Sequence, residues 1–460
     1  MLNRALMITA GLANSKFQHL PGDQKPLSNR RNVLPLRQTE YGCESMTEAD
    51  IVEIETWLDT QGLCGTSETA LVNGFCERCI AAGIKLERAN AFVDTLHPIY
   101  EGRVFLWRRD GEIEKPIIEY GSSQSGESAE NWQNSTFFHL LQIGEDELRQ
   151  RLEIIETPAF RHLVTLRDEG CTDYLALIHH FSREGSIGEM DCFYSSWTTD
   201  DPHGFEDSDI TALRRLTRGL ALAIKCASLT RIVRTLADVY LGRDAAQRVL
   251  AGRINRGAAE RIEAVLWYSD LRDYTRISDA AAPDAIIPML NDYAEAVISS
   301  IQEAGGDVLK LIGDGTLAIF THGESATACT AALKAQKALR KRLIGLNQTR
   351  EAAGQPTTKV YLGLHIGEVF YGNIGSDTRL DFTVVGPAVN EVSRIASMCR
   401  SVDQDILISE SFAAALPAEL RAKLVCVGRF ALRGVGRAQE LFTIDPAIVY
   451  ENYQGGASAR

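Results

Sequence analysis

The chain has 460 residues, too long for one ordinary hydrophobic core, and is therefore expected to form two domains with connecting elements. Apolar residues make up 45% of the chain and charged residues 24%, which is typical of globular proteins and excludes disorder along the whole length. A net charge of −13 argues against nonspecific binding to nucleic acid. We expect a cytoplasmic protein, because no apolar run reaches the ~18 to 20 residues of a membrane span and no secretory cleavage pattern is present.

The ten cysteines and nine histidines show no spacing that builds a disulfide framework or a zinc site. One C-x-x-C pair is formed by Cys76 and Cys79, which lie at helical spacing among apolar residues such as Phe75 and Ile80. Two interpretations of the pair stay open, core packing and a redox or metal pair. The apolar surroundings favour core packing.

Residues 1–46 are weakly basic, and three prolines interrupt regular structure, so this segment is predicted to form an irregular tail. The sequence leaves open whether translation starts at Met1 or at Met46. Residues 47–208 are predicted to form an α+β domain. Apolar residues recur at three- and four-residue intervals over 48–83, which predicts two amphipathic helices. Strands are predicted at 103–107, 115–120, 174–181 and 191–198, with a polar loop at 121–134 and a turn at 183–188.

The end of this domain carries the sequence Gly204-Phe205-Glu206-Asp207-Ser208-Asp209, which leads into a helical pattern of apolar residues. This ending resembles that of a GAF sensor domain, although no binding motif accompanies it. The resemblance implies a sensor that receives a small-molecule or protein signal whose identity is open.

Residues 209–254 are predicted to form a helical linker, in which helical periodicity continues as far as Tyr240. Its apolar residues follow spacings of four, three, four, three and four, as in a heptad seam: Leu222, Cys226, Leu229, Val233, Leu236 and Tyr240. One interpretation is an amphipathic helix packed on its own domain, and the other is a parallel two-stranded coiled coil. The dimer required by the catalytic interpretation below favours the coiled coil.

Residues 255–445 are predicted to form a second α+β domain, and residues 446–460 a tail. A buried-strand pattern over 263–270 ends in Asp270, and after a helix over 283–304 two apolar strands flank Gly313-Asp314-Gly315 as a hairpin. Each aspartate alone is most simply a turn residue. Together they can hold two magnesium ions that neutralise a triphosphate. The domain has 20 Lys/Arg against 23 Asp/Glu, so its charge does not oppose such a ligand.

Two further strands are predicted at 359–367 and 379–386, and a helix follows from Pro387. This helix places Asn390 and Arg394 four residues apart and therefore on one face. Alone, such a pair indicates a solvated polar face.

Four motifs of the second domain resemble, in order and spacing, those of class III nucleotidyl cyclases. They lie at 268–275, at Gly305-Gly306 with 310–314, at 365–375 and at 381–394. The resemblance implies a ferredoxin-like (βαββαβ) domain that converts ATP to 3′,5′-cyclic AMP and pyrophosphate. It further implies two Mg²⁺ or Mn²⁺ ions per site.

The resemblance assigns roles to residues of this chain. Asp270 and Asp314 match the metal-binding aspartates, and Lys310 and Thr383 match the two positions that read the purine. Lys310 favours ATP, because guanylyl cyclases resemble this pattern but carry a glutamate there.

Other positions match residues that act on the sugar and the phosphates. Asn390 matches the residue that orients the ribose, and Arg394 the one that stabilises charge on the reacting phosphate. Tyr274 and Thr275, with nearby backbone amides, and Arg433 are expected to contact the terminal phosphates.

In the family the metal aspartates come from one subunit and the other four matched groups from its partner. Because this chain carries all six, a homodimer with two complete sites is expected. Asp273-Tyr274 departs from the usual Gly-Phe, and Pro387-Ala388 from a common polar pair. The alternatives are a guanylyl cyclase and a noncatalytic nucleotide-binding module, which usually lacks an aspartate or the arginine that this chain retains.

Overall fold

The computed structural model describes residues 46–445 except 112, 122–126, 155–159, 182–186 and 189. The predicted tails at 1–46, apart from Met46, and at 446–460 lie outside the described residues, as does most of the predicted turn at 183–188. The chain divides into two compact units between Leu236 and Ala237, within the predicted linker 209–254. Within the described ranges, no helix combines the length and apolarity needed to cross a membrane.

The N-terminal unit is built on a six-stranded antiparallel sheet in the order β3-β2-β1-β6-β5-β4. Its strands are β1 (Arg88–Asp94), β2 (Gly102–Arg108), β3 (Ile117–Tyr120), β4 (Glu147–Arg151), β5 (Asp173–His180) and β6 (Cys192–Thr199). Side chains alternate between two cores: on β6, Phe193 and Trp197 enter one core, whereas Cys192 and Tyr194 enter the other. Apolar cores on both faces account for the strongly apolar strands.

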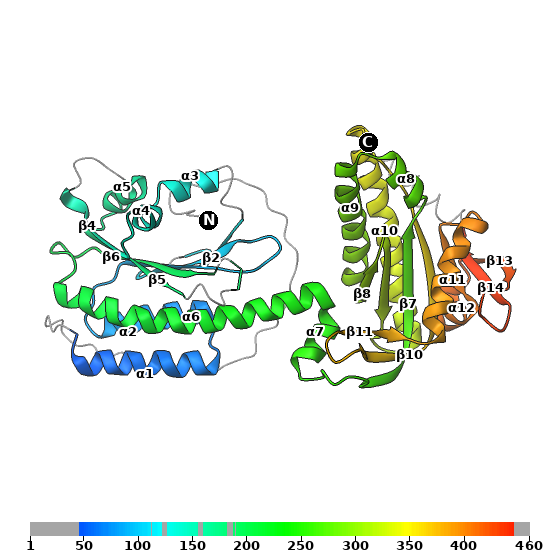
Figure 1. Ribbon diagram of the computed structural model, residues 1–460, viewed down its shortest axis with the longest axis horizontal. Helices are drawn as coiled ribbons and strands as arrows, with labels where there is room; N and C mark the ends of the chain where they lie inside the picture. The colour runs from blue at the N-terminus through cyan, green and yellow to red at the C-terminus, as the bar shows by residue number, and fades with distance from the viewer. Residues whose placement is uncertain are drawn as a thin grey trace. The chain divides into compact units, whose positions relative to one another are not determined.

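Helices cover both faces of this sheet (Figure 1). One face carries α1 (Glu48–Cys64), α2 (Glu68–Ala81) and α6 (Asp207–Leu241), and the other carries α3 (Glu127–Gln133), α4 (Thr136–Ile143), the 3₁₀ turn η1 (Leu152–Ile154) and α5 (Arg161–Asp168). The α+β prediction is confirmed, and Cys76 and Cys79 lie fully buried in the core. The loop predicted at 121–134 is wrong over α3, because Trp132 anchors that helix in the second core.

Helix α6 uses one face to close the N-terminal unit. Leu213, Leu216 and Ile224 are fully buried in that core, whereas Leu222 and Val233 on the predicted seam are 60% and 47% exposed. The helix therefore packs on its own unit and still presents part of the apolar seam. The coiled coil remains a prediction.

The C-terminal unit has the predicted βαββαβ core. In chain order the core consists of β7 (Ala259–Leu271), α9 (Pro283–Glu303), β8 (Asp307–Ile312), β9 (Gly315–Phe320), α10 (Ser325–Ala352) and β10 (Val360–Gly375). The strand order β10-β7-β9-β8 is that of a ferredoxin-like sheet. Gly305, with a φ of 83°, follows α9 and ends it as predicted.

The remaining elements extend this sheet or cover it. They are α7 (Arg243–Leu250), α8 (Tyr274–Ala280), β11 (Leu380–Val385), α11 (Pro387–Ser401), β12 (Ile406–Ser409), α12 (Glu410–Ala415), α13 (Ala418–Arg421), β13 (Leu424–Phe430) and β14 (Gln439–Ile444). Along β7, Val265 and Trp267 face a core shared with α9 and α10, whereas Ala264 and Leu266 face a core shared with α7, β11 and α11. Figure 1 shows helices on both sides of the sheet. The motifs that resemble those of nucleotidyl cyclases lie at the strand ends and on the face shared with α7, β11 and α11.

Candidate active site

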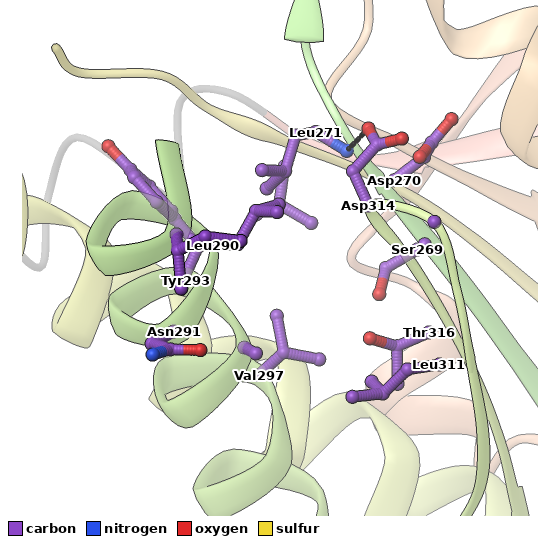
Figure 2. A pocket seen from close by; sticks show the side chains of 15 residues that line it. Ser269, Asp270, Leu271, Leu290, Asn291, Tyr293, Val297, Leu311, Asp314 and Thr316 are labelled. Carbon is purple, nitrogen blue, oxygen red and sulfur yellow. Dashed lines mark hydrogen bonds between the residues drawn. The ribbon is translucent and has the colours of Figure 1, made fainter. Parts of the chain in front are cut away.

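Strand pairing brings Asp270 and Asp314 together. Strands β7 and β9 are antiparallel with Ser269 opposite Thr316, so the end of β7 lies beside the tip of the β8–β9 hairpin. Gly313 at that tip has a φ of 62°, which glycine adopts without steric cost in a two-residue turn. The Leu271 amide donates a hydrogen bond to an Asp314 carboxylate oxygen at 3.2 Å (Figure 2).

The two carboxylates line a cavity of about 210 Å³ between the strand ends and α9. Burial raises the pKa of Asp270 to about 7, and the hydrogen bond and negative charge of Asp314 contribute to the increase. Asp270 therefore holds a proton over part of the neutral range.

This donor set fits a divalent cation whose other ligands come from the substrate and water. Among the described residues, no group of three or more His, Cys, Asp and Glu side chains could hold a metal ion. Mg²⁺ commonly binds proteins through one or two carboxylates and completes its shell with substrate phosphates and water. Asp270 and Asp314 offer that arrangement.

A second site lies at the start of α11. Asn390 and Arg394 line a groove of about 700 Å³ together with Arg433, which comes from the segment between β13 and β14. Asn390 and Arg394 are both exposed. None of the residues that line this groove lines the aspartate cavity. Within one chain, the predicted metal-binding aspartates therefore lie in one pocket, and the predicted catalytic residues Asn390 and Arg394 lie in another.

Lys310 and Thr383 belong to neither pocket. Lys310, on β8, forms an ion pair with Asp381, on β11, and Thr383 lies two residues further along β11. Sequence reasoning missed Asp381. The available signal was its two-residue spacing from Thr383, because alternate residues of a strand share a face.

Tyr274 and Thr275 begin the short helix α8, directly after Asp273. Asp273 has a φ of 56°, in the left-handed region where glycine is unstrained and aspartate is tolerated. Glycine, which the family resemblance leads one to expect at this position, would adopt this conformation without strain. The Asp273 carboxylate accepts a hydrogen bond from the Arg400 guanidinium at 2.7 Å, so a cation of α11 balances the extra negative charge.

Comparison with known proteins identifies the C-terminal unit. Residues 258–445 match the family described as the adenylate and guanylate cyclase catalytic domain. An adenylate cyclase from Anabaena cylindrica is 35% identical over 199 residues, which are 43% of this chain and 38% of the relative. Adenylate cyclase 1 from Rhizobium meliloti is 27% identical over 166 residues, 35% of this chain and 24% of the relative.

The matched regions thus span well under half of these two relatives. Among solved structures, the adenylyl cyclase CyaB from P. aeruginosa matches with a TM-score of 0.37 and 26% identity, covering 41% of this chain and 95% of that chain. The family match lies wholly within the unit whose core has the ferredoxin-like strand order. Residues 258–445 are a class III nucleotidyl cyclase catalytic domain.

Proposed function

We propose that this protein is an adenylyl cyclase that converts ATP to 3′,5′-cyclic AMP and pyrophosphate at the interface of a homodimer. The observation that carries the proposal is the pairing of Asp270 and Asp314 at one end of the sheet, where both carboxylates line one cavity. Two separate pockets in one chain agree with sites completed by a partner.

In this proposal Asp270 and Asp314 hold two Mg²⁺ or Mn²⁺ ions. When bound, such ions favour ionisation of the ribose 3′-hydroxyl and neutralise the phosphates. Asn390 of the partner orients the ribose so that its 3′-oxygen faces the α-phosphorus in line with the departing pyrophosphate. Arg394 stabilises the negative charge that develops on the reacting phosphate.

The remaining groups recognise the two ends of the nucleotide. Lys310 and Thr383 read the purine, with Lys310 favouring ATP. Tyr274, Thr275 and Arg433 contact the terminal phosphates, and Arg433 is suited to this because it lines the same groove as Arg394.

We also infer that the N-terminal unit senses a signal and regulates the cyclase domain. It has its own hydrophobic cores, and α6 continues from it into the second unit without interruption. The GAF-like character of this unit and the identity of its ligand or protein partner belong to the same proposal.

The full-length protein incubated with ATP or GTP, and with Mg²⁺ or Mn²⁺, tests the proposed function. We expect cyclic AMP and pyrophosphate in equal amounts from ATP, identified by chromatography and mass spectrometry. Preferential formation of cyclic GMP would assign a guanylyl cyclase. Nucleotide binding without any cyclic product would assign a noncatalytic module.

The raised pKa of Asp270 predicts that cation affinity depends on pH. Since the metal-free carboxyl holds a proton up to about pH 7, a cation must displace that proton below this pH. The affinity for Mn²⁺ should therefore rise about tenfold per pH unit up to about pH 7 and then level off. Isothermal titration calorimetry in buffers of different ionisation enthalpy measures both the affinity and the released proton.

Two variants serve as controls for this experiment. Asp279→Asn removes an exposed carboxylate on α8 and should leave the pH dependence unchanged. Asp270→Asn should abolish the pH-dependent component. An affinity that is constant between about pH 5.5 and 8 would show that proton displacement at Asp270 does not accompany binding.

A further inference from the structure

A β-bulge determines the direction of Lys310. Between β8 and β9 the register shifts so that Val308 pairs with Ala318 but Lys310 pairs with Leu317, which leaves Leu309 as the extra residue. In a regular ladder Lys310 would instead face Thr316. Paired residues lie on the same face of a sheet, and a bulge can redirect a side chain.

The two faces have different surroundings. Ala318 lies in the core shared with α9 and α10, whereas Leu317 lies in the core shared with β11. The bulge therefore moves Lys310 from the face covered by α9 and α10 to the face on which β11 lies. This change of face makes contact with Asp381 possible.

Along β11, buried apolar side chains alternate with polar side chains. Phe382 and Val384 are buried in the second core, so Asp381 and Thr383 project to the opposite side of the strand. The Lys310 ammonium forms an ion pair with the Asp381 carboxylate, and the two side chains are 45% and 43% exposed. An ion pair this exposed contributes little to the free energy of unfolding, so stability alone is a weak reason for the pair.

We propose that Asp381 positions the Lys310 ammonium for purine recognition and thereby sets the preference for adenine over guanine. The proposal rests on the proposed function, in which Lys310 reads the purine. An ammonium group only donates hydrogen bonds, and a carboxylate only accepts them. On the Watson–Crick edge, adenine N1 accepts a hydrogen bond, whereas guanine N1 carries a hydrogen and donates one. A carboxylate beside the lysine limits the directions in which its flexible ammonium donates, so the ammonium is held towards N1 of adenine and away from O6 of guanine.

The test compares ATP with GTP in the full-length dimer. In Asp381→Asn, the ratio of kcat/KM for ATP to that for GTP should fall about tenfold, mainly through a higher KM for ATP. Asp381→Glu should restore part of the ratio. Asp377→Asn is the matched control. Asp377 lies in the segment before β11, and its exposed carboxylate pairs with Arg256. Removing this carboxylate should leave the ratio unchanged.

A double-mutant cycle distinguishes positioning from direct contact. If Asp381 acts through the lysine, then Asp381→Asn should have no further effect on the ratio in a Lys310→Gln background. An additive effect, or an unchanged ratio in Asp381→Asn alone, would overturn the proposal. Unchanged thermal unfolding of each variant confirms that the fold is retained.

The proposed function and this inference fail in different ways. Absence of any cyclic product from the wild-type protein refutes the first, whereas a wild-type cyclase with an unchanged ratio in Asp381→Asn refutes only the second. If the wild-type chain shows no turnover, the ratio of its affinities for non-cyclisable ATP and GTP analogues, measured by calorimetry with Mn²⁺, replaces the ratio of kcat/KM values. A wild-type preference for ATP that Asp381→Asn reduces supports the inference, and equal preferences in both proteins overturn it.

Discussion

Replacing Asp314 by asparagine should lower the rate of cyclisation at least about a thousandfold while the protein remains folded and dimeric. The substitution removes half of the carboxylate pair, and a divalent cation supplies several kcal/mol of charge stabilisation to a reaction of this type. Asparagine keeps an oxygen that can accept the hydrogen bond from the Leu271 amide, so the hairpin tip should keep its place. Initial rates with saturating Mn²⁺ and ATP measure the loss.

Asp279→Asn, on the exposed surface of α8, controls for the removal of a negative charge and should retain the wild-type rate. The dimer fraction, measured by light scattering, should be the same in both variants. A folded Asp314→Asn dimer with the wild-type rate would contradict the assignment of Asp314 to the cation site.

Local signals in the sequence were sufficient for the elements that carry the aspartates. The strand predicted at 263–270 and the strands on either side of Gly313-Asp314-Gly315 are present as β7, β8 and β9. These elements are encoded by continuous apolar runs and by a turn that glycine favours, both of which depend on neighbouring residues. The proximity of Asp270 to Asp314 follows from pairing β7 with β9, an arrangement that the family resemblance implied.

Elements that depend on distant partners were harder to predict. The strand predicted at 359–367 continues to Gly375, because its second half pairs with β11 on one side and with the start of β7 on the other. Helix α3 lies within a segment rich in serine and glycine whose composition indicates a loop. It is anchored by Trp132, which packs edge-on against Tyr194 with ring centroids 6.0 Å apart.

The same distinction holds within the site. The sequence indicates Lys310 and Thr383 as candidate site residues. The ion pair of Lys310 with Asp381, however, depends on a β-bulge that no local pattern in β8 predicts. The strain at Asp273 was also hidden, because a left-handed residue is visible in the sequence mainly when it is glycine. Asp273 instead relies on Arg400, 127 positions away in the chain.

Mixing two inactive variants should restore cyclase activity if each site is shared between subunits. Asp270→Ala damages the cation pocket, and Arg394→Ala damages the groove at α11. In a mixed dimer one site combines the intact aspartates of one chain with the intact Arg394 of the other, while the second site carries both lesions. Random exchange of equal amounts makes half of the dimers mixed, so about a quarter of the wild-type rate should return.

The matched control mixes Asp270→Ala with Asp314→Ala. Both lesions lie in the same pocket, so every site in their mixed dimers lacks one aspartate and the rate should stay at the level of the single variants. Two different affinity tags measure how many mixed dimers form in each experiment. If Asp270→Ala and Arg394→Ala form mixed dimers without recovery, the two pockets do not combine across an interface, and the proposed shared site is wrong. Recovery in both mixtures would instead show that one working site takes Asp270 from one chain and Asp314 from the other, which would remove the basis for a cation held by the pair within one chain.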